Sequence, residues 1–254
     1  MSPAIRQRLI DRSLAARYDL FLGVGGGFTI LGLIFFIQAL SGGKADRAWQ
    51  LFHVNWLYFT GLATGSVAFA AVQKISNAKW SGMVIRFAEA SVAFLPVSLL
   101  GLLLTFTWGY SSIYGPMQNA LHELQHGKAV WLSHPFMFAR LAIGLTILTS
   151  VGWRLVRADM IPDLFDVRTA AGPGRRPLYE RWTRHYDGSP GALARQEEMI
   201  HRLSPLYVVL FAYVGTVVAF DGVMALQPHW YSNLLGGFYF MGSFLGGHML
   251  LVLT

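Results

Sequence analysis

The sequence predicts an all-α polytopic membrane protein, a helical bundle of about six transmembrane helices. Only 13% of its 254 residues are charged, whereas soluble domains average about 25%. Hydrophobic residues make up 54% of the chain, and the mean hydropathy is +0.44. Several apolar runs reach the roughly 20 residues that an α-helix needs to cross a bilayer. These observations together predict a chain that lies in a membrane.

The apolar runs define six expected spans, each able to cover about 30 Å at about 1.5 Å per residue. They comprise residues 18–40, 50–73, 82–109, 133–156, 203–226 and 229–254. The spans divide the chain into a cytoplasmic amphipathic lead-in (1–17), a first four-helix membrane bundle (18–156), a cytoplasmic loop (157–202) and the start of a second membrane bundle (203–254). A short helix is expected in the loop, around residues 191–202.

Basic residues indicate how the spans are oriented. With the N-terminus inside, fifteen Lys and Arg fall in inner segments, against three in outer segments, namely Lys44, Arg47 and Lys128. Short cytoplasmic segments carry the excess of positive charge in membrane proteins. The N-terminus and the loop 157–202 are therefore predicted to be cytoplasmic. The same distribution accounts for the net charge of +7, so this charge does not indicate a nucleic-acid partner.

Aromatic residues collect at the predicted outer ends of the spans. Such residues commonly form a belt at the membrane interface, where an apolar ring meets a polar tip. The belt expected here comprises Trp49, Trp56, Tyr110, Tyr114, Trp131, Trp230 and Tyr231. His53, at the same end of its span, is expected to be an interfacial histidine.

The absence of cysteine limits the chemistry of this chain. It excludes disulfides, thiolate nucleophiles, iron–sulfur ligation and covalent c-type haem attachment here. His53 and His248 are predicted at opposite ends of the bundle, so a bis-histidine haem is not expected either. No cofactor is therefore predicted within this chain.

Small residues at four-residue spacing indicate close helix contacts. The pairs are Gly23/Gly27, Gly61/Gly65 and Gly242/Gly246. Glycine at such spacing lets two helix backbones approach closely in a membrane. These pairs predict packing, and carry no functional assignment.

Ionisable residues within the spans are the candidate functional residues, because a charge inside the bilayer is costly and needs a partner or a role. Arg86 and Glu89 lie three positions apart, on one helix face. Arg140 and Asp221 are predicted at similar depths near the outer side, within reach of each other. Each pair can be a structural ion pair or a proton-exchanging acid held by an arginine.

The two pairs predict proton-path candidates at two depths. Arg86, Glu89 and His248 are expected in the inner half of the membrane, and Arg140 and Asp221 in the outer half. Two polar clusters separated by apolar side chains are what two proton half-channels require, each open to one aqueous side.

Several segments resemble the ActF subunits of alternative complex III, a bacterial quinol:cytochrome c oxidoreductase unrelated to the bc1 complex. The resemblance covers nearly the whole chain, and its motifs are specific mainly in combination. It is carried by the segments 53–65, 75–80, 86–90, 94–98, 220–224 and 228–232, which include His53-Val54-Asn55-Trp56, Arg86-Phe87-Ala88-Glu89 and Phe220-Asp221-Gly222.

The resemblance implies an NrfD/polysulfide-reductase-like fold built from four-helix bundles, in the inner membrane of a bacterium. It implies a non-haem subunit that is not catalytic alone, with membrane and peripheral subunits of a respiratory complex as partners. Haem c and iron–sulfur clusters would belong to those partners, and a quinone is a candidate ligand. It also implies proton-path roles for Glu89, Arg86, Arg140 and Asp221.

Two rival functions remain open from the sequence. One is a stand-alone secondary transporter, for which Pro96 is the one interior proline that could interrupt a helix. The other is a structural anchor for peripheral redox subunits. ActF proteins carry further helices, and the last span ends at Thr254 without a basic residue. The sequence is accordingly expected to be a fragment of a longer protein.

Overall fold

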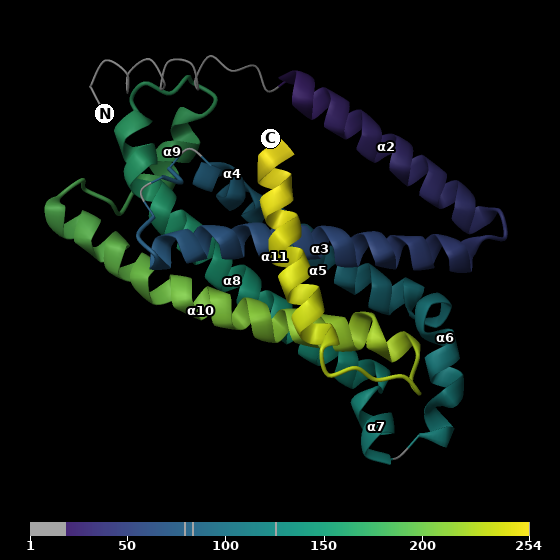
Figure 1. Cartoon of the computed structure of the whole chain (residues 1–254). Coiled ribbons are helices and arrows are strands. Elements are labelled where there is room, and N and C mark those ends of the chain that lie inside the picture. Colours follow the sequence, from purple (N-terminus) through teal and green to yellow (C-terminus); the bar gives the residue numbers. More distant parts are fainter. Residues whose placement is uncertain (1–18, 79, 83, 125, 254) are drawn as a thin grey trace. The chain divides into compact units, whose positions relative to one another are not determined.

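The computed structural model describes residues 19–78, 80–82, 84–124 and 126–253. Its secondary structure is helical throughout this part of the chain, which confirms the predicted fold class (Figure 1). The α-helices are α2 (Asp19–Ser41), α3 (Ala45–Ile75), α4 (Val84–Ala90), α5 (Leu95–Leu104), α6 (Tyr110–Ala120), α7 (His126–Trp131), α8 (His134–Val167), α9 (Arg176–Thr183), α10 (Pro190–Gly222) and α11 (Leu235–Leu253). The shorter turns are η1 (Ser91–Phe94), η2 (Thr105–Gly109), η3 (Leu121–Glu123) and η4 (Met224–Leu226). The predicted lead-in, residues 1–17, lies outside the described residues.

Five helices of the described chain are long and apolar enough to cross a membrane. They are Leu22–Ser41, Val84–Glu123, His134–Val167, Pro190–Leu226 and Leu235–Val252, and they correspond to the first, third, fourth, fifth and sixth predicted spans. The second predicted span forms α3, which has 31 residues but is not among the five. Polar side chains such as His53, Asn55 and Thr60 lower its hydropathy.

Three helices extend beyond the apolar runs that predicted them. The third span stays helical to Glu123, through a 3-10 turn at η1 and a π turn at η2. α8 continues to Val167, and α10 already begins at Pro190. The expected short helix at 191–202 is thus the start of α10. Hydropathy marks only the part of a helix that matches the bilayer, whereas α10 begins at Pro190, a residue that suits the first position of a helix.

The chain divides into two compact units. One comprises the described residues up to Gly43 together with Arg157–Glu197, and the other comprises Lys44–Val156 together with the chain from Glu198 onwards. α8 and α10 contribute residues to both.

A small core stabilises the polar connection in the first unit. Ile161 and Phe165 of α8 pack with Tyr186 and Ala192, and the Phe165 and Tyr186 rings meet edge to face with centroids 5.1 Å apart. Gly188 faces this core with φ +74°, and a Cβ there would lie 2.7 Å from the Phe165 ring. The turn therefore requires glycine both for its left-handed backbone and for space.

A side-chain cap begins α10. The Ser189 hydroxyl oxygen accepts the Ala192 N–H at 3.1 Å, which satisfies one of the free donors of the first turn. The Ser189 N–H and hydroxyl both donate to Asp187 Oδ1, at 3.0 Å and 2.7 Å. These two hydrogen bonds, the backbone one first, hold the pKa of Asp187 below its ordinary value.

Replacing Ser189 with alanine should loosen the start of α10. Loss of a cap of this type costs about 1 kcal/mol, which corresponds to a roughly five-fold change in a local opening equilibrium. Hydrogen–deuterium exchange of the peptide containing Ala192, measured in detergent, should rise by that factor. Ser189→Thr keeps the capping oxygen and should exchange like the wild type. Equal exchange rates in Ser189→Ala and Ser189→Thr would show that the hydroxyl does not stabilise the start of α10.

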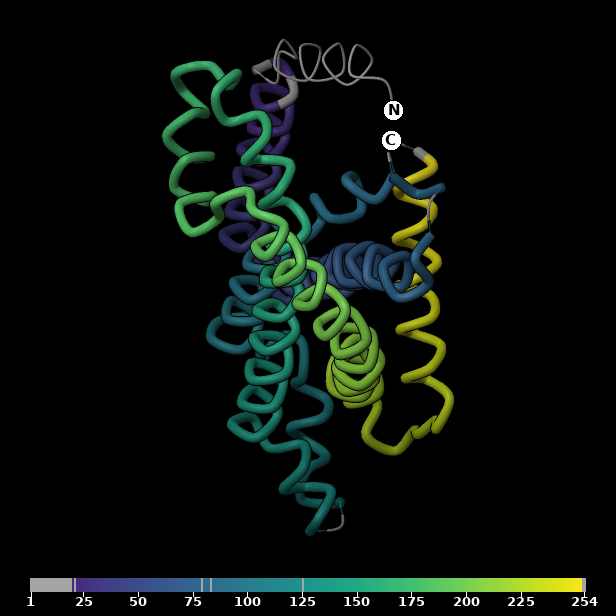
Figure 2. The backbone as a smooth tube through the Cα atoms, turned by 90° about the vertical axis from the view of Figure 1, so that its left-hand side faces the viewer, coloured from purple at the N-terminus to yellow at the C-terminus, as the bar shows by residue number. Residues whose placement is uncertain are grey.

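Helix α3 is the centre of the second unit. It packs against α4, α5, α6 and α11, and Figure 2 looks nearly along its axis with α11 passing beside it. Its polar residues His53, Thr60 and Thr64 are buried within the fold. Because neighbouring helices cover these side chains, α3 can carry them at depth.

The α3–α11 crossing depends on glycine. A Cβ at Gly65 would lie 2.0 Å from the Ser243 carbonyl oxygen, and one at Gly61 would lie 2.6 Å from the Ser243 hydroxyl. On the other helix, a Cβ at Gly247 would lie 2.5 Å from the Ser66 nitrogen. The predicted contact at Gly61/Gly65 is therefore confirmed.

The other two glycine pairs behave differently. Gly246 faces Leu62, but a Cβ at Gly242 would meet nothing within 4 Å. The same holds for Gly23 and Gly27, so the close contact predicted at that pair is not formed within the described chain. Glycine spacing alone does not distinguish these pairs from Gly61/Gly65.

Candidate functional site

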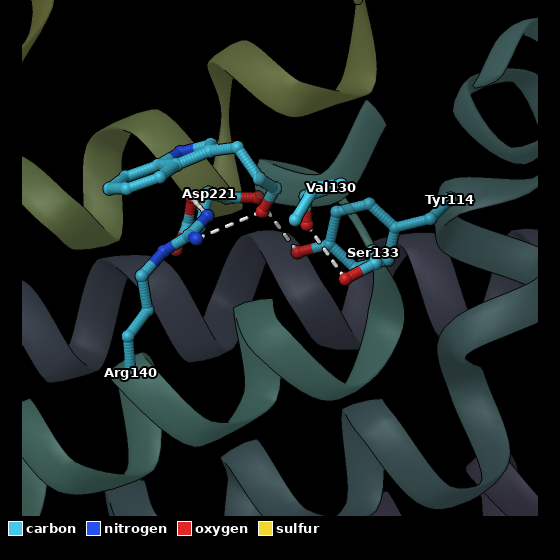
Figure 3. A network of polar contacts seen from close by, with 6 residues as sticks. Tyr114, Val130, Ser133, Arg140 and Asp221 are labelled. Carbon is cyan, nitrogen blue, oxygen red and sulfur yellow. Dashed lines mark hydrogen bonds and ion pairs between the residues drawn. The ribbon is translucent and has the colours of Figure 1, made fainter. Parts of the chain in front are cut away.

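A buried ion pair joins α8 to the end of α10. Arg140 Nε donates to Asp221 Oδ2 at 2.6 Å, and a terminal guanidinium nitrogen donates to Oδ1 at 2.5 Å (Figure 3). The Asp221 side chain is 1% exposed and the Arg140 side chain 14%. The predicted contact between Arg140 and Asp221 is confirmed, and the geometry is the two-pronged form that guanidinium and carboxylate groups favour.

Trp131 contacts the same arginine through both its carbonyl group and its ring. The other terminal nitrogen of Arg140 donates a hydrogen bond to the Trp131 carbonyl oxygen at 2.9 Å. The guanidinium carbon lies 3.9 Å from the centroid of the Trp131 ring. The same guanidinium carbon lies 5.0 Å from the centroid of the Phe136 ring. Arg140 thus has a carboxylate, a carbonyl and two aromatic faces around one charge.

Two side chains form hydrogen bonds with the last carbonyl groups of α10. The last carbonyl groups of a helix have no partner within it. Here the Tyr114 hydroxyl of α6 donates to the Asp221 carbonyl oxygen at 3.0 Å, and His53 Nε2 of α3 lies 2.8 Å from the Gly222 carbonyl oxygen. Because a carbonyl can only accept, His53 carries a proton on Nε2. Figure 3 shows Tyr114 reaching this turn beside the ion pair.

We call Arg140, Asp221, Trp131, His53 and Tyr114 the Asp221 cluster. Both carboxylate oxygens of Asp221 already accept a hydrogen bond from Arg140. Each of these oxygens keeps a second lone pair, and a proton that binds there neutralises the carboxylate and weakens its attraction for the guanidinium. If Arg140 moves away from the neutralised acid, its contacts with the Trp131 carbonyl group and ring can still hold it. The arrangement therefore suits either a fixed clamp between α8 and α10 or a proton site coupled to a shift of Arg140.

The second predicted pair is formed on α4. Arg86 donates to Glu89 Oε2 at 2.6 Å; the acid side chain is 4% exposed and the arginine 37%. Arg86 and Glu89 are three residues apart, on one face of the helix. Their predicted contact is confirmed.

His248 lies near the core against which α4 packs. Its ring stacks edge-on against Phe69 and Phe244, with centroids 4.3 Å and 4.4 Å away. Phe69 belongs to the core that includes Ile85 and Ala88 of α4. The His248 Nδ1 lies 2.8 Å from the Phe244 carbonyl oxygen, so that nitrogen carries the proton.

Burial corrects the predicted aromatic belt. Trp131, Trp230 and Tyr231 are exposed, but Trp49, Trp56, Tyr110 and Tyr114 are buried inside the second unit. For Trp56 and Tyr114, backbone carbonyls supply the polar partners that the membrane interface was expected to offer. One example is Trp56, whose ring N–H donates to the Ser98 carbonyl oxygen at 2.8 Å.

His53, Tyr114 and Trp131 are the residues that the sequence did not assign to the site. His53 was expected at the interface, but it is buried, 2% exposed. Its partner and that of Tyr114 are main-chain oxygens, which leave no pattern in a sequence. Trp131 was expected only in the aromatic belt, and its contact with Arg140 crosses the break between α7 and α8.

The described residues include no cluster of three or more His, Asp or Glu side chains that could hold a metal ion. What the structure establishes is a helical membrane protein with a buried ion pair between α8 and α10 and a second, partly exposed pair on α4. Comparison with known proteins adds nothing to this, since no family model matches the chain and no curated protein matches it.

Proposed function

We propose that this chain is an integral membrane subunit of a respiratory quinol:electron-acceptor oxidoreductase of the alternative complex III type. The membrane-spanning helices and the resemblance in the segments around His53, Glu89 and Asp221 support the proposal. The subunit acts only within its complex. Partner subunits carry the haem c groups and iron–sulfur clusters, and a quinone is a candidate ligand of the membrane part.

The same proposal gives the chain a part in proton conduction. The observation that carries it is the buried Arg140–Asp221 pair, in which an acid is held at a helix end by a partly accessible arginine. Glu89, held by Arg86 on α4, is a second acid at another place in the bundle. Buried ionisable groups within membrane helices commonly mark proton routes.

Two amide variants test the proton role. Asp221→Asn and Glu89→Gln keep shape and hydrogen bonding but cannot titrate. In the assembled complex we expect quinol oxidation to persist while the number of protons translocated per electron falls. Glu180→Gln, in an exposed pair with Arg176, is the matched control and should leave the ratio unchanged.

A structural anchor is the second candidate, and the closed geometry of the Asp221 cluster favours it. Both oxygens of the Asp221 carboxylate accept a hydrogen bond from Arg140, and the side chain is 1% exposed. If both amide variants translocate protons like the wild type, the acids are structural and the anchor role is the correct one.

Purification from the native membrane separates these roles from transport. Multihaem and iron–sulfur subunits that co-purify with the chain support the complex. A single polypeptide that carries out solute-dependent transport in vesicles contradicts it, and would favour the stand-alone transporter.

We further propose an N-terminus on the cytoplasmic side of the bacterial inner membrane, from the fifteen-to-three distribution of basic residues. The chain has no cysteine, so single cysteines introduced at Ser41 and Ser189 report the orientation. In intact cells, an impermeant thiol reagent should label Ser41→Cys and spare Ser189→Cys. The reverse pattern would overturn the orientation.

A further inference from the structure

A small pocket lies beside the middle of α3 in the second unit. Its volume is about 10 Å³, and α3, α8, α10 and α11 all contribute to its wall. Most of the wall is apolar and comes from Leu145, Leu148, Phe211, Val214 and Val218. Its polar lining comes from Thr60, Thr64 and Tyr239. A cavity that combines this size with three hydroxyl groups differs from an ordinary packing defect, which is apolar throughout.

Thr60 is the residue that gives this cavity a chemical preference. It is 2% exposed, and its hydroxyl has no hydrogen-bond partner among the described residues. Buried hydroxyl groups are nearly always hydrogen-bonded, to protein or to an ordered water. Thr64, one turn further along α3, satisfies its own hydroxyl by donating to the Thr60 carbonyl oxygen at 2.7 Å. Thr60 makes no such contact.

The other two hydroxyl groups already donate hydrogen bonds, and Tyr239 also has a hydrogen bond with the Ser243 side chain. Thr64 donates to α3 carbonyl oxygens, and Tyr239 donates to the Leu57 carbonyl oxygen at 2.8 Å. Each hydroxyl oxygen retains a lone pair that can accept a hydrogen. Thr60 can donate. The three groups together therefore match a small ligand that accepts one hydrogen bond and donates two.

We propose that this cavity is a binding site for a single water molecule held by Thr60, Thr64 and Tyr239. A buried water needs a space of roughly 10–15 Å³ and two to four polar partners. The cavity provides about 10 Å³ and three hydroxyl groups. Any larger polar ligand is excluded by volume, and an ion is excluded because no charged residue lines the space.

The site lies on a face of α3 that carries polar side chains along the middle of the helix. His53, Leu57, Thr60 and Thr64 follow each other at spacings of four, three and four, and so share one face of α3. The segment that was expected to separate the two polar clusters with apolar side chains therefore carries buried hydroxyl groups. The water site itself does not rest on the proposed function. Within that function, it would place a hydrogen-bonding step between the Asp221 cluster and the α4 pair.

Removal of one hydroxyl tests the site. Thr60→Val keeps the shape of the side chain and removes its hydroxyl, and Thr60→Ser keeps the hydroxyl and removes a methyl group. Cryo-electron microscopy of the complex or of the chain in nanodiscs, at a resolution that shows ordered waters, gives the readout. Wild type and Thr60→Ser should show water density against residue 60, and Thr60→Val should show none.

Two results would overturn the site. One is a wild-type map with ordered waters elsewhere but none against Thr60. The other is unchanged density in Thr60→Val. Helical content by circular dichroism, compared between the two variants, shows that any loss of density is not a loss of fold. Because occupancy is measured directly, the result is distinct from that of the proton-translocation assay.

Discussion

Replacement of Gly65 with alanine is expected to weaken the packing of α11 on α3 more than any other single methyl addition in the second unit. The new Cβ would lie 2.0 Å from the Ser243 carbonyl oxygen and 2.9 Å from the Phe244 nitrogen. Both obstacles are backbone atoms, so no side chain can rotate away and the helices must separate. Overpacking of this kind costs about 1–3 kcal/mol or more. Thermal unfolding in detergent should show the loss.

Gly242 offers a matched control on α11. A Cβ there meets nothing within 4 Å, so Gly242→Ala should be neutral, or stabilising by about 0.5–1 kcal/mol because alanine favours helix. Gly61→Ala should fall between the two variants, since its obstacle is the Ser243 hydroxyl, which can rotate. Equal unfolding temperatures for Gly65→Ala and Gly242→Ala would contradict the described crossing.

Loss of either partner of the Arg140–Asp221 pair should produce the second large effect. Arg140→Met strands the carboxylate, and Asp221→Leu strands the guanidinium, each in a place that water reaches little. Breaking a buried pair by removal of one partner typically costs about 3–5 kcal/mol. Unfolding by denaturant in detergent measures the change. Each single variant should have a lower free energy of unfolding than the wild type.

The double variant Arg140→Met/Asp221→Leu is the decisive comparison. It removes both charges, so its loss of stability should be much smaller than the sum of the two single losses. The exposed pair Arg176–Glu180 supplies the control, with side chains 55% and 52% exposed. Changing either of its members should cost at most about 1 kcal/mol. Additive losses at positions 140 and 221 would show that the two charges do not depend on each other.

Hydropathy predicted most of the helices because a membrane span needs both length and low polarity. It succeeded least at α3, where His53, Thr60 and Thr64 reduce the apolar signal. Those residues lie on the face of α3 that neighbouring helices cover, whereas Val54 and Tyr58 of the same helix are exposed. A window average cannot tell a helix that is polar toward water from one that is polar toward its neighbours.

The ion pairs could be predicted from the sequence, and their surroundings could not. Counting residues from the helix ends placed Arg140 and Asp221 at one depth, and the three-residue spacing placed Arg86 beside Glu89. The contacts of His53 and Tyr114 depend on which carbonyl groups the end of α10 leaves free. That depends on tertiary packing, and neither residue has a neighbour in the sequence that would reveal it.

The contacts of Arg140 have a consequence for the order in which the protein is made. Ribosomal synthesis proceeds from the N-terminus, so Trp131 and Arg140 emerge long before Asp221. The Trp131 carbonyl and ring lie only nine residues away and hold the guanidinium locally. These are contacts that Arg140 can make before Asp221 has been synthesised. Asp221 is synthesised after both Arg140 and Tyr114, so the residues that contact it are already part of the chain when it is added.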